Sequence, residues 1–238
     1  LIFWIAFILL IFSLIGIVKL KVENSFIDYF KSNTEIYKGM KVIDQNLGGT
    51  TLLDVTIDFN KKTILDDDED TIMQEDEDFD DIFLELETSD DDPKYWFTRD
   101  KMNKIEVLHD YLDSLEHTGT VLSFATILKI GRNLNNGQNL DSVQLGLLYE
   151  KLPEKYKKII LSPYISTEHN QARINLRVKD SDPSLRRNQL INKIKNNSYK
   201  QINIESEQIK LSNILILYNN MLQSLFDSQI KTLGLVVA

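Results

Sequence analysis

The sequence predicts an α+β domain held between two membrane-spanning helices. Three observations predict this arrangement: an uncharged apolar run over residues 1–18, two stretches of alternating polarity at 51–59 and 173–179, and amphipathic helical patterns between and after those stretches. About 200 residues follow the first run, and a chain of that length can bury one sizeable core.

The first run is about 27 Å long as an α-helix, which is close to the hydrocarbon thickness of a bilayer. The first charge appears at Lys19. A buried core helix is the alternative, but a soluble protein rarely has a helix that is apolar on every face. A cleaved signal peptide is disfavoured because the run has neither a basic leader nor a small-residue cleavage site. We expect a transmembrane helix over 1–22 and, because the sequence starts with Leu1, a fragment of a longer protein.

Residues 23–50 are expected to connect this helix to the domain. Ser32 or Asn33 is the expected N-cap of a helix that ends at Gly48-Gly49. The apolar residues of this helix recur at helical spacing: Ile36, Met40, Ile43 and Leu47.

The α+β domain is expected over 51–213. In Thr51 to Phe59 every second residue is apolar, which predicts a half-buried strand. Thr98 is the expected N-cap of an amphipathic helix to Glu116, with apolar residues Met102, Ile105, Leu108, Leu112 and Leu115. The later elements are a short strand at 120–124, a helical insert at 125–162 broken at 135–137 and at Pro153, a strand at 173–179, a basic helix at 184–197 and a strand at 207–212. This order of elements is typical of a split βαβ, or ferredoxin-like, sandwich.

The net charge of −9 comes from one acidic segment and not from the whole chain. Residues 66–92 hold 16 of the 36 acidic residues and none of the 27 basic ones, so the rest of the chain has 20 acidic and 27 basic residues. Like-charge repulsion predicts a mobile acidic insert, in which Ile82 to Leu86 could form a short strand. A calcium site is the alternative, since carboxylates are oxygen ligands, but no spacing here matches an EF-hand loop.

The sequence offers no pattern of catalytic chemistry. It has no Cys, and His109, His117 and His169 are isolated, so neither a disulfide nor a metal site is predicted. No serine-hydrolase elbow, Walker loop or zinc-protease motif is present, and Gly48-Gly49 precedes a strand instead of opening a helix. We therefore expect no enzyme, no cofactor, and no catalytic, cofactor-binding or metal residue. A ligand pocket is most expected between the sandwich and the helices of 125–162.

The basic helix is not expected to bind nucleic acid. Its cations lack aromatic stacking partners, so a solvated face is the favoured interpretation for Arg186, Arg187, Lys193 and Lys195.

Residues 214–238 predict a long helix that leads into a second membrane helix, because the sequence is wholly apolar after Thr232. Asp227 and Lys231 precede this apolar stretch, so we expect them at the membrane interface instead of inside the bilayer.

Two segments resemble the porter loops of MMPL-type exporters in the RND transporter superfamily. The residues that resemble the entry segment of such a loop are Asn24, Tyr29-Phe30, Thr34 to Met40, Ile43-Asp44 and Leu47 to Thr50. Those that resemble the lead into the following membrane helix are Leu217 to Phe226, Ser228-Gln229 and Thr232 to Gly234. The resemblance covers nearly the whole chain except the acidic insert, and is strongest to the second porter loop, between the seventh and eighth membrane helices.

The resemblance implies a proton-driven exporter of hydrophobic or lipid-like molecules, whose porter domain faces the periplasm from the inner membrane. The partners it implies are the bilayer, the remaining membrane helices and the other porter loop; the energy-coupling residues would lie in helices outside this chain. Lys19 and Lys21 conflict with this orientation, because basic residues favour the cytoplasmic side. The alternative function is a single-pass, membrane-anchored binding or sensor domain.

Deleting residues 66–92 is expected to leave the domain folded, because loop length affects stability only weakly. Circular dichroism and urea unfolding of the deletion variant and the parent chain would check this. Loss of cooperative unfolding, or ordering of the insert by calcium in the parent chain, would contradict the interpretation as a mobile insert.

Overall fold

The computed structural model describes residues 3–5, 12–13, 16, 23, 25–60 and 96–237. Most of the expected membrane helix at 1–22, the acidic insert and the short strand expected within it lie outside these residues. Within the described ranges, no helix combines the length and the apolar character needed to cross a bilayer.

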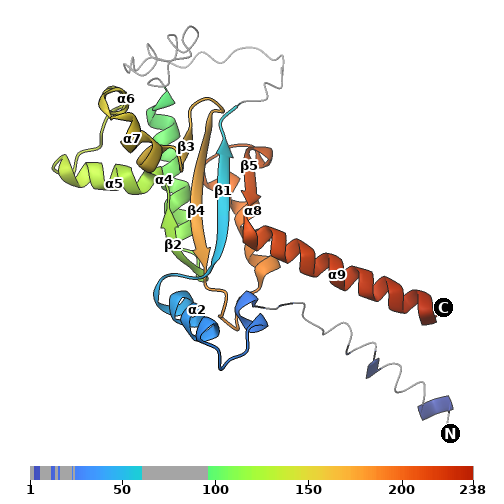
Figure 1. The fold of residues 1–238 in the computed structure, drawn as a ribbon. Coiled ribbons are helices and arrows are strands. Elements are labelled where there is room, and N and C mark those ends of the chain that lie inside the picture. The colour runs from blue at the N-terminus through green and yellow to red at the C-terminus, as the bar shows by residue number, and fades with distance from the viewer. Residues whose placement is uncertain are drawn as a thin grey trace, which may run out of the picture.

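The described elements alternate between helices and strands, as Figure 1 shows. The helices are the 3-10 turn η1 (Phe26–Tyr29), α2 (Glu35–Asn46), α4 (Arg99–Asp113), α5 (Phe124–Leu134), α6 (Ser142–Lys151), the short α7 (Glu154–Tyr156), the π-turn η3 (Lys157–Leu161), α8 (Arg187–Gln201), the 3-10 turn η4 (Ser206–Gln208) and α9 (Ile214–Val237). The strands are β1 (Thr51–Asp58), β2 (Thr118–Leu122), β3 (Ile165–Ser166), β4 (Gln171–Val178) and β5 (Ile209–Ser212).

The strands form one sheet in the order β2-β4-β1-β5, and β3 pairs with β4. All the pairings are antiparallel, and Val55 of β1 lies opposite Ile174 of β4 on one side and Leu211 of β5 on the other. The chain passes from β1 through α4 to β2, and from β4 through α8 to β5, so each pair of connected strands has a strand of the other pair between them. The fold is therefore α+β, as the sequence predicts.

The core lies between the sheet and the helices α4 and α8, which pack against each other. Leu53, Val55 and Ile57 point to this side of β1 and are fully buried, as the alternation predicts. Burying a side chain of this size contributes about 1.5–3 kcal/mol. The helices supply the other side of the core with Met102, Ile105, Leu108, Leu112, Leu190, Ile191 and Ile194. The opposite face of the sheet is mostly polar and partly solvated, with the apolar side chains of Leu52 and Leu122 exposed on it.

Several predicted helix boundaries shift. Thr34, and not Ser32 or Asn33, caps α2, because its side-chain oxygen accepts a hydrogen bond from the Tyr37 N–H at 3.3 Å. The basic helix begins at Arg187 and not at residue 184, because the Asp182 carboxylate holds the N–H and hydroxyl of Ser184 in a turn at 2.8 and 2.6 Å. Thr98 caps α4 as expected.

The apolar stripe of α2 is the largest departure from an ordinary amphipathic helix. The helix forms where the spacing predicts it, but Ile36, Ile43 and Leu47 remain exposed and the buried side chain is that of Asp44. The described part of the domain therefore does not cover this stripe.

The backbone of the turn between α2 and β1 packs directly against the backbone at the start of β2. Gly48 and Gly49 have φ values of +85° and +113°, a region that L-residues with side chains rarely adopt. Gly119, at the start of β2, lies so close that a β-carbon there would overlap the carbonyl group of Gly48. Both sides of this contact therefore require glycine.

Gly119→Ala is expected to lower the free energy of unfolding by about 2–3 kcal/mol, because the added methyl group has no room. Gly39→Ala is the matched control, since Gly39 lies inside α2 with nothing within 4 Å of its β-carbon position. Alanine there is expected to raise the free energy of unfolding by about 0.5–1 kcal/mol. Urea unfolding of both variants measures the two effects, and equal effects would contradict the proposed contact.

Candidate functional site

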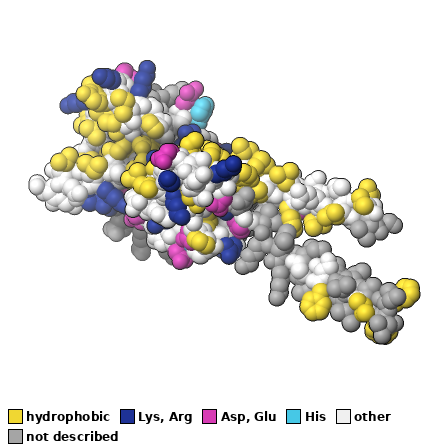
Figure 2. Space-filling model, turned by 60° about the horizontal axis from the view of Figure 1, so that its bottom comes forward, with side chains coloured by type: hydrophobic (Ala, Val, Ile, Leu, Met, Phe, Trp, Pro, Cys, Tyr) yellow, Lys and Arg dark blue, Asp and Glu magenta, His cyan; other side chains and the backbone are white. Residues whose placement is uncertain are grey.

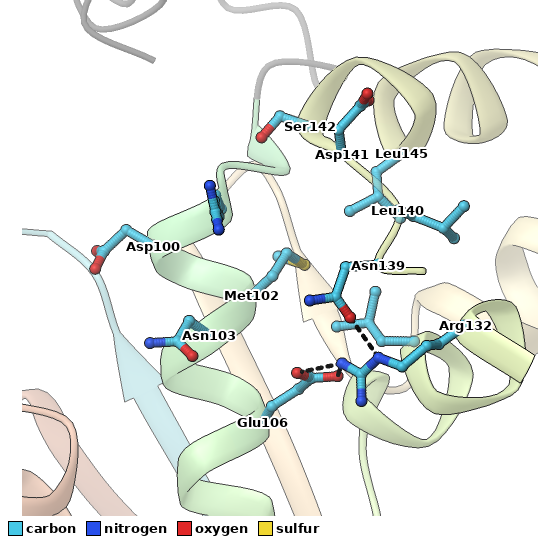
Figure 3. Close-up of a pocket in the computed structure, with 12 residues that line it drawn as sticks. Asp100, Met102, Asn103, Glu106, Arg132, Asn139, Leu140, Asp141, Ser142 and Leu145 are labelled. Atoms are coloured by element: carbon cyan, nitrogen blue, oxygen red, sulfur yellow. Dashed lines mark hydrogen bonds and ion pairs between the residues drawn. The ribbon is translucent and has the colours of Figure 1, made fainter. Parts of the chain in front are cut away.

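A pocket of about 720 Å³ lies between α4 and the helices of the insert (Figure 3). Its lining comes from α4, α5, the connection that follows α5, and the start of α6. The lining residues are Arg99, Asp100, Met102, Asn103, Glu106, Leu128, Arg132, Asn139, Leu140, Asp141, Ser142 and Leu145. This is the region in which the sequence predicts a pocket.

Local sequence signals fix the walls of the pocket. Ser123 caps α5 by accepting the Ala125 N–H at 3.0 Å, and Asp141 caps α6 by accepting the Gln144 N–H at 2.7 Å. The connection between these helices comes close to α5 at Gly131, where a β-carbon would lie 2.8 Å from the Leu140 side chain. Gly131 thus lets Leu140 pack against α5 at the edge of the pocket.

An ion pair crosses the pocket wall from α4 to α5. The Arg132 Nη2 atom donates to both carboxylate oxygens of Glu106, at 2.7 and 2.8 Å, and the Arg132 Nε atom donates to Asn139 Oδ1. Figure 3 shows both interactions converging on Arg132. The two charged side chains are only partly exposed, so the pair is better shielded from solvent than a surface salt bridge. It holds the two helices and the connection at a fixed separation.

The other charges at the pocket are mostly satisfied. Asp100 pairs with Lys104 at 2.5 Å, and Asp141 is occupied by its capping role. The Arg99 side chain makes no hydrogen bond or ion pair with the described residues. Met102, Leu128, Leu140 and Leu145 supply apolar surface. A pocket with apolar walls and a few polar groups is suited to bind a small molecule with both apolar and polar parts.

A second polar cluster is buried where the chain enters the domain. Asp180, which follows β4, accepts hydrogen bonds from the Ser25 hydroxyl and the Phe26 N–H, both at 2.7 Å. The Arg187 guanidinium pairs with Asp180 at 2.5 Å and with Glu23 at 2.9 Å. Asp180 and Arg187 are 2% and 3% exposed, so these charges are removed from water and paired with each other.

Asp44 extends this cluster into α2. Its carboxylate accepts hydrogen bonds from the N–H and hydroxyl of Thr50, at 2.8 and 2.7 Å. It also accepts the Asp180 N–H at 2.9 Å and the N–H and hydroxyl of Ser181 at 2.9 and 2.7 Å. Burial alone would raise the pKa of Asp44, but the hydrogen bonds from Ser181 and Thr50 outweigh it and the pKa is lowered. The side chain therefore stays ionised inside the domain.

Arg187 corrects the interpretation of the basic helix. A solvated face was expected for its four cations, but Arg187 is buried, because Asp180 and Glu23 provide partners that helix composition does not reveal. Lys193 and Lys195 are exposed and Arg186 is half-buried. Sequence reasoning missed this cluster; the available signal was the acid Asp180, two residues after the alternating strand β4.

The three histidines occupy separate environments. His109 is buried in α4, with its Nδ1 3.0 Å from the Ser123 hydroxyl oxygen, and burial lowers its pKa. The Nδ1 of His117 lies 3.2 Å from Asp182, and His169 is exposed. Among the described residues, no group of three or more His, Cys, Asp or Glu side chains is arranged to hold a metal ion. Asp227 and Lys231 are exposed on α9.

Comparison with protein families, curated proteins and solved structures finds no match to this chain.

Asp44→Asn is expected to lower the free energy of unfolding by about 3 kcal/mol at neutral pH, because an amide cannot accept all five donors of the cluster. The lowered pKa of Asp44 adds stability that is present above pH 3.8, its ordinary pKa, and is lost as the pH falls through the folded-state value. The variant should therefore lose less stability on acidification than the parent chain.

Urea unfolding at several pH values between about 6 and 3 measures both effects. Asp28→Asn is the matched control, because Asp28 is an exposed acid in the neighbouring turn η1. An Asp44→Asn variant as stable and as acid-sensitive as the parent chain would contradict the role of Asp44.

Proposed function

We propose that the chain is the extramembrane porter domain of an integral-membrane exporter, of the MMPL type in the RND superfamily. In this proposal the domain faces the periplasm, and membrane helices on both sides tie it to the inner membrane. It contributes a binding site for a hydrophobic or lipid-like molecule that the whole protein exports with the proton gradient.

The observation that carries this proposal is that the chain enters and leaves the domain at one place. The Tyr218 ring in α9 lies against two rings of the entry turn η1, with centroid distances of 6.4 Å to Phe26 and 6.2 Å to Tyr29. Glu23, before this turn, is held by Arg187 at 2.9 Å. An inserted domain with a membrane helix at each end requires this geometry, because both helices must start from the same side.

The sheet supports the same proposal. Its strand order and two crossovers, β1-α4-β2 and β4-α8-β5, fit a ferredoxin-like split βαβ sandwich, which is the fold that the resemblance implies. We infer that α5, α6 and α7 are an insertion between the two halves of this sandwich. The pocket between α4 and this insertion is the proposed ligand site.

A single-pass, membrane-anchored binding or sensor domain is the alternative function. The pocket by itself is compatible with this function as much as with an exporter. That function requires α9 to dock on the domain as an amphipathic helix. Leu215, Tyr218 and Asn219 are buried at its start, but Leu225, Leu233 and nearly every other described residue after the third turn remain exposed. This exposure favours a helix that continues away from the domain (Figures 1 and 2).

Asn103→Trp is expected to lower export by about tenfold, because the bulky ring fills the pocket from α4 at an exposed position and removes the space for a ligand. Asp113→Trp is the control, since Asp113 is exposed on the same helix but does not line the pocket. The measurement uses the full-length protein in proteoliposomes, a fluorescently labelled phospholipid and an imposed proton gradient.

The parent protein and the Asp113→Trp variant should export the labelled lipid, and only when the gradient is present. Absence of gradient-driven export by the parent protein would contradict the exporter proposal. Binding of the labelled lipid without export would favour the anchored binding domain. Equal export by the two tryptophan variants would contradict the assignment of the pocket.

A further inference from the structure

The helix α2 carries an apolar stripe that the described part of the domain leaves open. Ile36, Ile43 and Leu47 are 57%, 39% and 59% exposed, and Met40 between them is half-buried. At about 100° per residue these four side chains lie along one side of the helix. Asp44 and its hydrogen bonds fix the rotation of the helix about its axis, so the exposure of the stripe is built into the fold.

Further exposed apolar and aromatic residues lie at the same end of the domain. Phe26 and Tyr29 of η1 are 43% and 59% exposed, and Leu217 and Met221 of α9 are 72% and 46% exposed. Figure 1 places α2 and η1 together at this end, beside the start of β1. Figure 2, with this end turned forward, shows hydrophobic side chains next to Lys or Arg side chains on the domain, and further hydrophobic side chains along α9. Tyrosine at such a surface is typical of the boundary between membrane and water.

Lysines lie on the polar side of α2, opposite the stripe, and in the turn before the helix. Lys31, Lys38 and Lys41 are all exposed. Glu35 offsets one of these charges, since it lies 3.6 Å from Lys38, and Lys41 lies over the Tyr37 ring at 5.7 Å from its centroid. A helix with one apolar side and lysines on its polar side is the type that lies in the surface of an anionic membrane.

The helix α2 follows the apolar run at 1–18 after a short connection. Only residues 19–34 separate the apolar run at 1–18 from the start of α2. This short connection is itself held to the domain, because Glu23 pairs with Arg187 while Ser25 and Phe26 bind Asp180. If the run spans the bilayer, α2 cannot lie far from the membrane surface.

From these observations we infer that α2 is an interfacial helix, which lies on the membrane surface with Ile36, Met40, Ile43 and Leu47 inserted among the lipids. This inference rests on the proposed function in one respect: the run at 1–18 must be a membrane helix. The occupant of the stripe is then the lipid of the same bilayer, and Lys31, Lys38 and Lys41 add electrostatic attraction to its anionic headgroups.

The absence of cysteine from the chain makes a direct test simple. Single-cysteine variants of the full chain, Ile43→Cys in the stripe and Gln45→Cys on the opposite, exposed side of α2, are labelled with an environment-sensitive fluorophore. A third variant, Leu10→Cys, labels the middle of the apolar run. The chain is reconstituted into vesicles of phosphatidylcholine and phosphatidylglycerol, with and without brominated acyl chains that quench nearby fluorophores.

Brominated lipid is expected to quench the label at Ile43→Cys at least about twofold, because an interfacial helix buries its apolar side at the boundary between headgroups and acyl chains. The label at Gln45→Cys should keep its fluorescence, and the label at Leu10→Cys should be quenched most strongly. Circular dichroism confirms that each variant is folded, which is expected because Ile43 and Gln45 are exposed.

The outcomes separate this inference from the proposed function. Quenching at position 10 without quenching at position 43 would overturn the interfacial helix but would still support a membrane helix at 1–18. No quenching at position 10 would contradict the membrane helix and with it the proposed function. A blue-shifted but unquenched label at position 43 would overturn the interfacial helix, because it would show that protein covers the stripe. That protein would be another membrane helix or a second copy of the chain. Equal quenching at positions 43 and 45 would overturn the orientation of α2.

Discussion

The buried cluster of Asp180, Arg187 and Glu23 fixes how the chain enters the domain. These charges lose their hydration on folding, and their mutual attraction offsets that loss only when the hydrogen-bonding geometry is complete. It is complete for Asp180, whose two carboxylate oxygens accept bonds from Ser25, Phe26 and Arg187. Removing any one member would leave a buried charge unpaired, so the members of the cluster depend on one another. It ties the entry segment to the end of β4 and the start of α8 in a single arrangement.

Local patterns in the sequence were sufficient to predict most elements but not how they meet. Alternation identified β1 and β4, the Thr98 cap and apolar stripe identified α4, and Asn135 to Gly137 and Pro153 marked the breaks in the insert. The burial of Arg187 was not predictable in this way. Its partner Asp180 is seven residues away in the chain but its partner Glu23 is 164 residues away, so no short window of sequence contains the whole cluster. The cap of α2 was misplaced because Ser32, Asn33 and Thr34 are all competent caps in succession.

The pocket and the stripe of α2 show two further limits of local patterns. The region of the pocket followed from the position of the insert, but its lining depends on contacts such as that of Leu140 with Gly131, in a connection without periodicity. For α2 the spacing predicted a helix with an apolar side. Periodicity shows that a side of a helix needs an apolar environment, but it does not distinguish a protein core from lipid. Only the exposure of Ile36, Ile43 and Leu47 in the structure shows that the described part of the domain leaves this side open.

A short path joins the entry end of the domain to the pocket. The turn that ends α2 at Gly48 touches Gly119 without any intervening side chain, so this contact has no flexible side chain to absorb a displacement. Gly119 belongs to β2, and β2 runs directly into Ser123, which caps α5 at the pocket wall. The ion pair between Arg132 and Glu106 then connects α5 to α4 across the pocket. A shift of α2 relative to the sheet must therefore move β2 or break this contact, and a moved β2 changes the position of the helix that lines the pocket.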